Sequence, residues 1–147
     1  MRPLRPRVSR FLALPPEDRR VIIHAAGLIP WMAARLRLTG LQRLRANHID
    51  IAATSPSNLD PSATKDRALH IALLVAIAAR NGPYRGTCLS QSLALLQLLK
   101  REGIDAHLRL GVRKEASLEA HAWVEYEGRP LNDTPDVATR YAPYPAL

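Results

Sequence analysis

Residues 86–103 read GTCLSQSLALLQLLKREG, and this run predicts an amphipathic helix. Leucines recur at helical spacing from Leu89 to Leu99, which predicts a broad apolar face packed against a core. A glycine and Thr87 open the run, and a basic pair followed by a second glycine closes it, as is typical of helix ends. Cys88 therefore falls in the first turn of a core helix.

Cys88 is the only cysteine in the chain, so it cannot form an intramolecular disulfide and can contribute little to a metal site. Two roles remain for its thiol. It can pack as a small apolar group at the helix end. Alternatively it can react, because unpaired N–H groups and the helix dipole favour a thiolate at a helix N-terminus. Residues further along the chain decide between these roles.

The segment after this helix predicts an antiparallel sheet. Residues 106–113 alternate between apolar and polar, the period of a half-buried strand. Residues 121–126 are rich in aromatic and β-branched types, which predicts a second strand. Residues 129–132 predict a third strand, and Gly128 marks the turn before it.

The length of that turn determines whether His121 can meet Asp133. A two-residue loop of Glu127 and Gly128 would place the two side chains on opposite faces of the sheet. A three-residue loop that also includes Tyr126 would pair them directly, with their Cβ atoms about 5 Å apart. We predict the three-residue loop, because it places a glycine where a left-handed residue is needed.

A thiol, an imidazole and a carboxylate supply the nucleophile, base and orienting group of acyl-transfer catalysis. In this hypothesis Cys88 attacks a carbonyl, His121 holds the proton and later gives it to the leaving amine, and Asp133 fixes the imidazole tautomer. The backbone N–H of Cys88 is the first oxyanion donor. The second donor stays open, with Gln91 and Tyr84 as polar residues nearby in sequence.

The strongest motifs lie between residues 82 and 135. They are Gly86-Thr87-Cys88-Leu89-Ser90, Leu110-Gly111-Val112, His121-Ala122-Trp123-Val124-Glu125 and Asn132-Asp133. These motifs resemble the transglutaminase-like cysteine peptidases of lasso peptide biosynthesis. The resemblance implies removal of the leader from a ribosomally made precursor, which frees an amine for a separate ATP-dependent lasso cyclase. By matching positions it also implies a nucleophile at Cys88, a base at His121 and an orienting acid at Asp133.

Fused members of that family carry a strand-rich leader-recognition domain before the peptidase. The N-terminal half of this chain predicts no strands, and 147 residues are enough for one domain. We therefore expect one peptidase domain over 1–147, with a helical scaffold over 1–81 and the catalytic helix and sheet over 82–147. The resemblance then implies that a separate leader-recognition protein delivers the leader peptide.

The expected fold class is α+β. N-terminal helices pack around the cysteine-bearing helix, beside a small antiparallel C-terminal sheet of three or four strands. This arrangement is similar to a papain or transglutaminase-like core reduced to its minimum. We expect Trp31 in the core, Trp123 as a shield for the imidazole, and no regular structure after Asp136.

The N-terminal half predicts the scaffold helices. One helix starts at Pro16, where proline and two acidic residues suit a first turn, and Pro30 is expected to kink it. A second helical segment reaches about Leu44. Residues 47–63 predict a connector, and residues 64–80 predict a core helix.

The net charge of +8 arises entirely before residue 49, where ten basic residues stand against two acidic ones. Charge runs are often only solvated faces, but this one could also attract an acidic leader or its carrier protein. Only 5% of residues are aromatic and no nucleic-acid-binding motif accompanies the arginines, so we expect no nucleic acid partner.

We also expect that the chain is not a membrane-spanning, secreted or metal-binding protein. The apolar run at 71–79 is too short to span a membrane, and no signal peptide precedes it. A lone thiol suits the reducing cytoplasm. The isolated histidines lack partners at metal-binding spacing, so we expect neither a metal nor a cofactor.

Two other functions stay open. The same three residues would permit a transglutaminase-like acyltransferase or deamidase, because an acyl-enzyme does not dictate its acceptor. The chain could also be a catalytically silent peptide-binding module that presents the basic helix to a partner.

Overall fold

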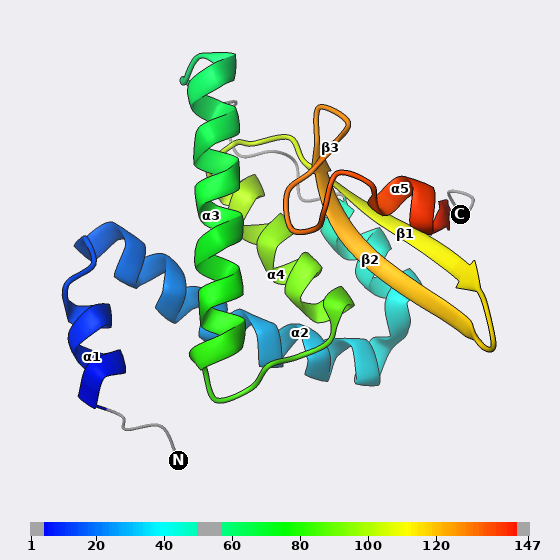
Figure 1. The fold of residues 1–147 in the computed structure, drawn as a ribbon, viewed down its shortest axis with the longest axis horizontal. Helices are drawn as coiled ribbons and strands as arrows, with labels where there is room; N and C mark the ends of the chain where they lie inside the picture. The colour runs from blue at the N-terminus through cyan, green and yellow to red at the C-terminus, as the bar shows by residue number, and fades with distance from the viewer. Residues whose placement is uncertain (1–4, 50–56, 144–147) are drawn as a thin grey trace.

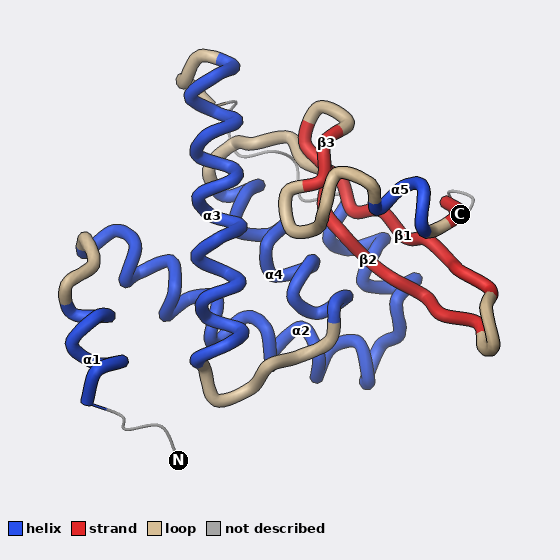
Figure 2. The backbone as a smooth tube through the Cα atoms, in the orientation of Figure 1, coloured by secondary structure: helices blue, strands red, loops and turns tan. Residues whose placement is uncertain are grey.

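The computed structural model of the chain describes residues 5–49 and 57–143, and within them the fold is α+β, as predicted. The helices are α1 (Arg5–Leu12), α2 (Pro16–Ile49), α3 (Pro61–Asn81), α4 (Cys88–Arg101) and α5 (Val137–Arg140). The strands are β1 (His107–Lys114), β2 (Leu118–Tyr126), β3 (Arg129–Pro130) and β4 (Ala142–Pro143). They form one antiparallel sheet in the order β3-β2-β1-β4. Figure 1 shows α4 between α3 and the sheet, and Figure 2 shows the strands gathered to one side of the helices.

The cysteine-bearing helix α4 lies at the centre of the fold, in contact with α2, α3, β1 and β2. Its leucine face is buried as predicted, with Leu95 and Leu99 fully enclosed. Its start is fixed by a capping box, in which Thr87 Oγ1 accepts from Ser90 N at 3.2 Å and Ser90 Oγ accepts from Thr87 N at 2.9 Å. The helix therefore begins at Cys88.

Gly86 is required before this cap. Its φ is +72°, and a Cβ there would lie 2.5 Å from Ile29 Cγ2 of α2. The turn that presents Cys88 can thus pack directly on the core of the helical layer, because it carries no side chain at this point.

Helix α2 departs from the sequence prediction in two ways. It continues through Pro30, where a kink was expected, and the residue with non-helical backbone is Gly40, where φ is 74° and ψ is 164°. The prediction that Trp31 is core is also wrong, since its side chain is 59% exposed. Ile29 and Met32 face the core, so the helical period turns Trp31 outward.

The connector between α2 and α3 is shorter than expected, and residues 50–56 lie outside the described part of the chain. Helix α2 continues to Ile49, and α3 begins at Pro61 because Asp60 caps it by accepting from Ala63 N at 2.8 Å. Helix α1 was not predicted from the sequence. Phe11 of α1 packs against the core formed by α2, α3 and α4.

One stretch of α2, Pro16–Arg43, has the length and mean hydropathy of a membrane-spanning helix, at 1.3 over its most apolar window. Core helices of soluble proteins meet the same criteria, and one face of α2 contributes Ile22, Ala25 and Ile29 to the core. The expectation of no membrane span stays a prediction.

The turn after β2 contradicts the predicted three-residue loop. Tyr126 pairs with Arg129, so the loop has two residues, Glu127 and Gly128. Their φ values of 49° and 73° are those of a type I′ turn, whose twist matches that of the flanking strands. Strand β3 ends at Pro130, where proline offers no N–H to a ladder.

The segment after Asp136 is also more regular than expected. It forms α5 and then β4, which pairs with β1 through Gly111↔Pro143 and Val112↔Ala142. Trp123, Val137 and Tyr141 make a second, smaller core beneath it. This C-terminal segment therefore belongs to the packed part of the molecule.

Candidate active site

Cys88 and His121 border the same cavity, although they lie 33 positions apart in the chain. The cavity has a volume of about 310 Å³. Cys88 is partly buried and is the first residue of α4. It therefore lies at the helix end where backbone N–H groups lack partners within the helix. The other lining residues are largely apolar: Leu41, Gln42, Leu89, Leu110, Gly111, Val112, Ala120 and Ala122.

His121 is hydrogen-bonded through Nε2 to Asp133 Oδ2. Both side chains are mostly buried, at 23% and 14% exposed. Because the carboxylate occupies Nε2, the imidazole is left with Nδ1 for exchange of a proton with the thiol. The structure thus brings His121 to Asp133 as predicted, but not through the predicted register.

Asp133 reaches His121 because the chain leaves the sheet before it. Leu131 N donates to Val124 O at 2.8 Å, and the side-chain Oδ1 of Asn132 then accepts from Val124 N at 2.8 Å. The Asn132 side chain thereby takes the place of the next backbone acceptor for β2, so the main chain can turn away from the sheet. The following residue, Asp133, folds back onto His121.

Hydrogen bonds through the buried Ser92 connect the cysteine helix α4 to the histidine strand β2. Asn132 Nδ2 donates to Ser92 Oγ at 3.0 Å, and Ser92 Oγ donates to Ala122 O at 3.1 Å. Ser92 is fully buried. The sequence prediction missed this role, although a serine on the leucine face of a helix was a signal that its hydroxyl has a buried partner.

The second oxygen of Asp133 is held by other groups. Arg140 Nη2 lies 2.8 Å from Oδ1, and the backbone N–H of Thr134 donates to the same oxygen at 2.7 Å. Burial acts to raise the pKa of Asp133, but the hydrogen bonds from His121 and Thr134 and the charges of His121 and Arg140 outweigh it and lower that pKa. The carboxylate is therefore ionised at neutral pH.

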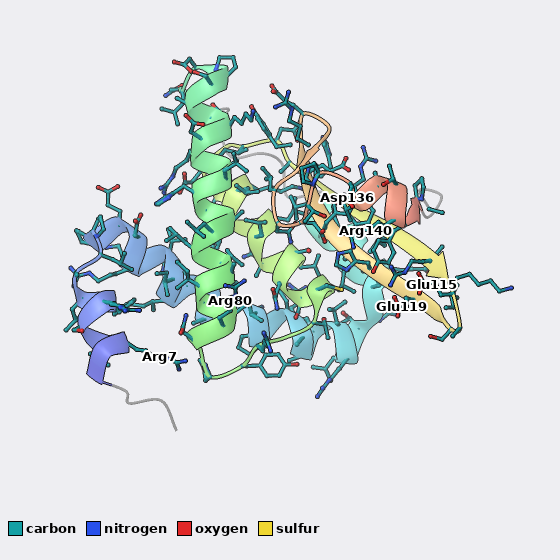
Figure 3. All side chains as sticks on the ribbon, viewed as in Figure 1. Arg7, Arg80, Glu115, Glu119, Asp136 and Arg140 are labelled. Carbon is teal, nitrogen blue, oxygen red and sulfur yellow. The ribbon has the colours of Figure 1, made fainter. Side chains whose placement is uncertain are left out.

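Arg140 was not predicted from the sequence. It also pairs with Asp136, with Nε 3.3 Å from Oδ2, and Figure 3 shows the two side chains beside one another at α5. Nothing in the spacing of Arg140 from Asp133 signals the contact, because it depends on how α5 packs.

Two aromatic rings flank the imidazole. The centroids of His121 and Trp123 are 6.0 Å apart in a stacked arrangement, and Tyr141 lies 4.9 Å from His121. Trp123 is only 2% exposed and its Nε1 donates to Glu125 Oε1 at 2.9 Å. Trp123 therefore shields the imidazole, as predicted.

The two polar residues near Cys88 have other partners. Gln91 Nε2 donates to the carbonyl of Arg85 at 2.8 Å, and Tyr84 packs against the hydrophobic core. Neither is placed by a contact with Cys88, so the second oxyanion donor stays open. Among residues 5–49 and 57–143 no group of three or more His, Cys, Asp or Glu side chains is gathered as metal ligands, and the absence of a metal stays a prediction.

The site thus combines a thiol at a helix N-terminus, a histidine on strand β2 and an aspartate in the loop after β3. The chain belongs to the transglutaminase-like superfamily, whose family model matches residues 31–146. It is similar to the microcin J25-processing protein McjB of Escherichia coli, with 41% identity over 54 residues. That match covers 37% of this chain and 26% of the McjB protein, so the chain spans about a quarter of that relative. No solved structure matches the chain.

Proposed function

We propose that this chain is a cysteine peptidase that removes the leader from a lasso precursor peptide. In this proposal Cys88 is the nucleophile, His121 the base and Asp133 the orienting acid. The observation that carries it is that His121, which is hydrogen-bonded to Asp133, borders the same cavity as Cys88.

The chemistry follows from these positions. His121 Nδ1 takes the thiol proton, and Sγ of Cys88 attacks the scissile carbonyl, whose oxygen turns toward the backbone N–H of Cys88. The imidazolium gives its proton to the leaving amine as the C–N bond breaks, which leaves a thioester on Cys88. Water then attacks the thioester while His121 accepts its proton, and the thiol is restored. Asp133 holds the imidazole through Nε2 in both steps.

The substrate class rests on similarity. The McjB relative is named a processing protein for microcin J25, and the sequence motifs resemble lasso leader peptidases. We infer that this chain acts on a precursor leader presented by a separate leader-recognition protein in the cytoplasm. The freed N-terminal amine is the group that an ATP-dependent cyclase would consume.

Mass spectrometry of the products tests the proposal. The chain is incubated with a lasso precursor, with and without its recognition protein, beside a Cys88→Ala variant. We expect the wild-type chain to split the precursor at one bond, and the variant to bind it with no detectable turnover. Binding and cleavage that survive in Cys88→Ala would exclude a role for the thiol.

Membership of the transglutaminase-like superfamily favours a second candidate, acyl transfer to an amine. Both reactions pass through the same thioester and differ only in the acceptor. A primary amine added to the reaction separates them, because a transferase joins the amine to the intact precursor. A peptidase releases two fragments whether or not the amine is present.

A further inference from the structure

Helix α3 carries two leucines that are half exposed. Leu69 is 41% and Leu73 is 57% exposed, and their i,i+4 spacing places both on one side of the helix. They line a groove of about 470 Å³ with Ala72, Val75, Ala76, Gln91 and residues 131–134. Figure 1 shows α3 in green and the loop after β3 in orange on either side of α4, and all three contribute residues to the groove.

The groove adjoins the candidate catalytic residues. Asp133 forms part of one wall, and Gln91 lies one helical turn beyond Cys88 on α4. Cys88 and His121 border the other cavity, so the two hollows lie on either side of the histidine–aspartate pair. The groove therefore begins next to the residues proposed for catalysis.

We infer that this groove, formed by α3 and residues 131–134, binds the precursor peptide on one side of the scissile bond and seats an aliphatic side chain between Leu69 and Leu73. The inference rests on the proposed peptidase function, since the occupant is its substrate. A peptidase must hold an extended chain beyond the reacting carbonyl, and the cavity at Cys88 is only about 310 Å³.

The chemistry of the two walls suits this occupant. The α3 wall is aliphatic, so it gains most from an aliphatic partner that removes both leucines from water. Helix α4, between the two walls, offers a polar atom. Gln91 Nε2 donates to Arg85 O, and no hydrogen bond to Gln91 Oε1 is found among residues 5–49 and 57–143. An extended peptide presents N–H groups to such an acceptor along its length.

Steady-state kinetics on Leu69→Gln and Leu73→Gln test the inference. Each change places a polar group on an exposed helix surface, so folding should be preserved, and a circular dichroism melt verifies it. We expect KM for the precursor to rise roughly five- to tenfold with kcat little changed, because the contact is made equally in ground and transition states. Leu12→Gln is the matched control, since Leu12 is 59% exposed on α1 and borders neither hollow.

Substrate variants identify the seated side chain. Each aliphatic residue of the precursor near the cleaved bond is changed to Asn. One of these changes should raise KM with the wild-type chain but not with the Leu73→Gln chain, and it identifies the residue that contacts Leu73. An unchanged KM in both leucine variants would overturn the inference. So would a change from dimer to monomer on Leu73→Gln in light scattering, since a second copy would then be the occupant.

The proposal that the groove binds the precursor can fail independently of the peptidase proposal. If the wild-type chain does not cleave the precursor, the assignment fails, and the groove is still tested by binding of fluorescently labelled precursor to Cys88→Ala with and without Leu73→Gln. Equal affinity of these two chains would overturn the groove. A weaker affinity of the double variant would support it.

Discussion

Asp133 divides its two oxygens between the imidazole of His121 and two anchoring groups. Oδ2 meets His121, whereas Oδ1 receives Arg140 at 2.8 Å and the N–H of Thr134 at 2.7 Å. A carboxylate held at both oxygens cannot rotate away from the imidazole. Arg140 is therefore a positioning residue for the dyad and also helps to keep the carboxylate ionised.

Arg140→Gln should shift the acid limb of the pH–rate profile to higher pH. The pKa of Asp133 is lowered in the folded protein, so its ionised form is present above that pKa and is lost as the pH falls through it. Removal of the arginine charge raises that pKa, and activity is then lost at a higher pH. We expect kcat/KM near neutral pH to fall roughly tenfold, by analogy with other orienting groups.

Arg140→Lys is the control for this effect, because it retains the charge and gives up the fork geometry. It should restore most of the profile. An acid limb that does not move in Arg140→Gln would show that Arg140 acts only in packing.

Ser92→Ala should destabilise the fold. The change removes the fully buried hydroxyl of Ser92, so the hydrogen bonds from Asn132 Nδ2 and to Ala122 O are both lost, which costs about 1–3 kcal/mol. Urea unfolding measures this, with Ser117→Ala in the exposed β1–β2 turn as control. Equal stability of the two variants would mean that the Ser92–Asn132 bridge contributes nothing.

At the scale of elements, the turn after β2 shows what the sequence could and could not determine. Gly128 at positive φ was predictable, but Glu127 also adopts a positive φ, which a sequence pattern does not favour at a non-glycine residue. The His121–Asp133 contact was predicted from a register that does not occur. It forms because the Asn132 side chain, in place of a backbone carbonyl, accepts the hydrogen bond from Val124 N. No local sequence pattern signals this replacement.

The boundaries of α4 were predictable because each rests on local chemistry. Thr87 caps its start, and a basic pair with Gly103 follows its leucine face. The helix that carries Cys88 and the strand that carries His121 therefore follow from sequence alone. The pairing of β4 with β1 and the packing of α5 beside Trp123 depend on residues far apart in the sequence and were missed.

Gly111→Ala should disturb the element that covers the dyad. A Cβ at Gly111 would lie 2.7 Å from the Cβ of Tyr141 and 3.0 Å from the Trp123 ring, so α5 and β4 must shift. We expect a loss of about 1–3 kcal/mol of stability, measured by thermal unfolding, and lower kcat/KM as Tyr141 moves off His121. Gly27→Ala is the control, since nothing lies within 4 Å of its Cβ and alanine favours the helix. A Gly111→Ala chain as stable as the Gly27→Ala chain would contradict the packing described.

At the scale of the whole molecule, the candidate site draws on both halves of the chain. Sequence patterns placed the scaffold over 1–81 and the catalytic elements over 82–147. The cavity at Cys88 also receives Leu41 and Gln42 from α2, just beyond the bend at Gly40. The sequence offered Pro30 as the place where the helix direction changes, whereas the non-helical residue next to this wall is Gly40.

Gly40→Ala tests whether that bend builds the site. The backbone of Gly40 has φ 74° and ψ 164°, a conformation that costs a residue with a Cβ about 1–3 kcal/mol. The variant gains stability if α2 straightens, and the wall that bears Leu41 then moves away from Cys88. We therefore expect kcat/KM to fall. The thermal midpoint should change little, because an alanine in a straightened helix regains the stability that backbone strain would cost. Gly27→Ala on the same helix is again the control and should leave kcat/KM unchanged, since Gly27 borders neither hollow. Full activity in Gly40→Ala, with stability lost, would show that the bend serves only the packing of α2 and that the cavity does not depend on it.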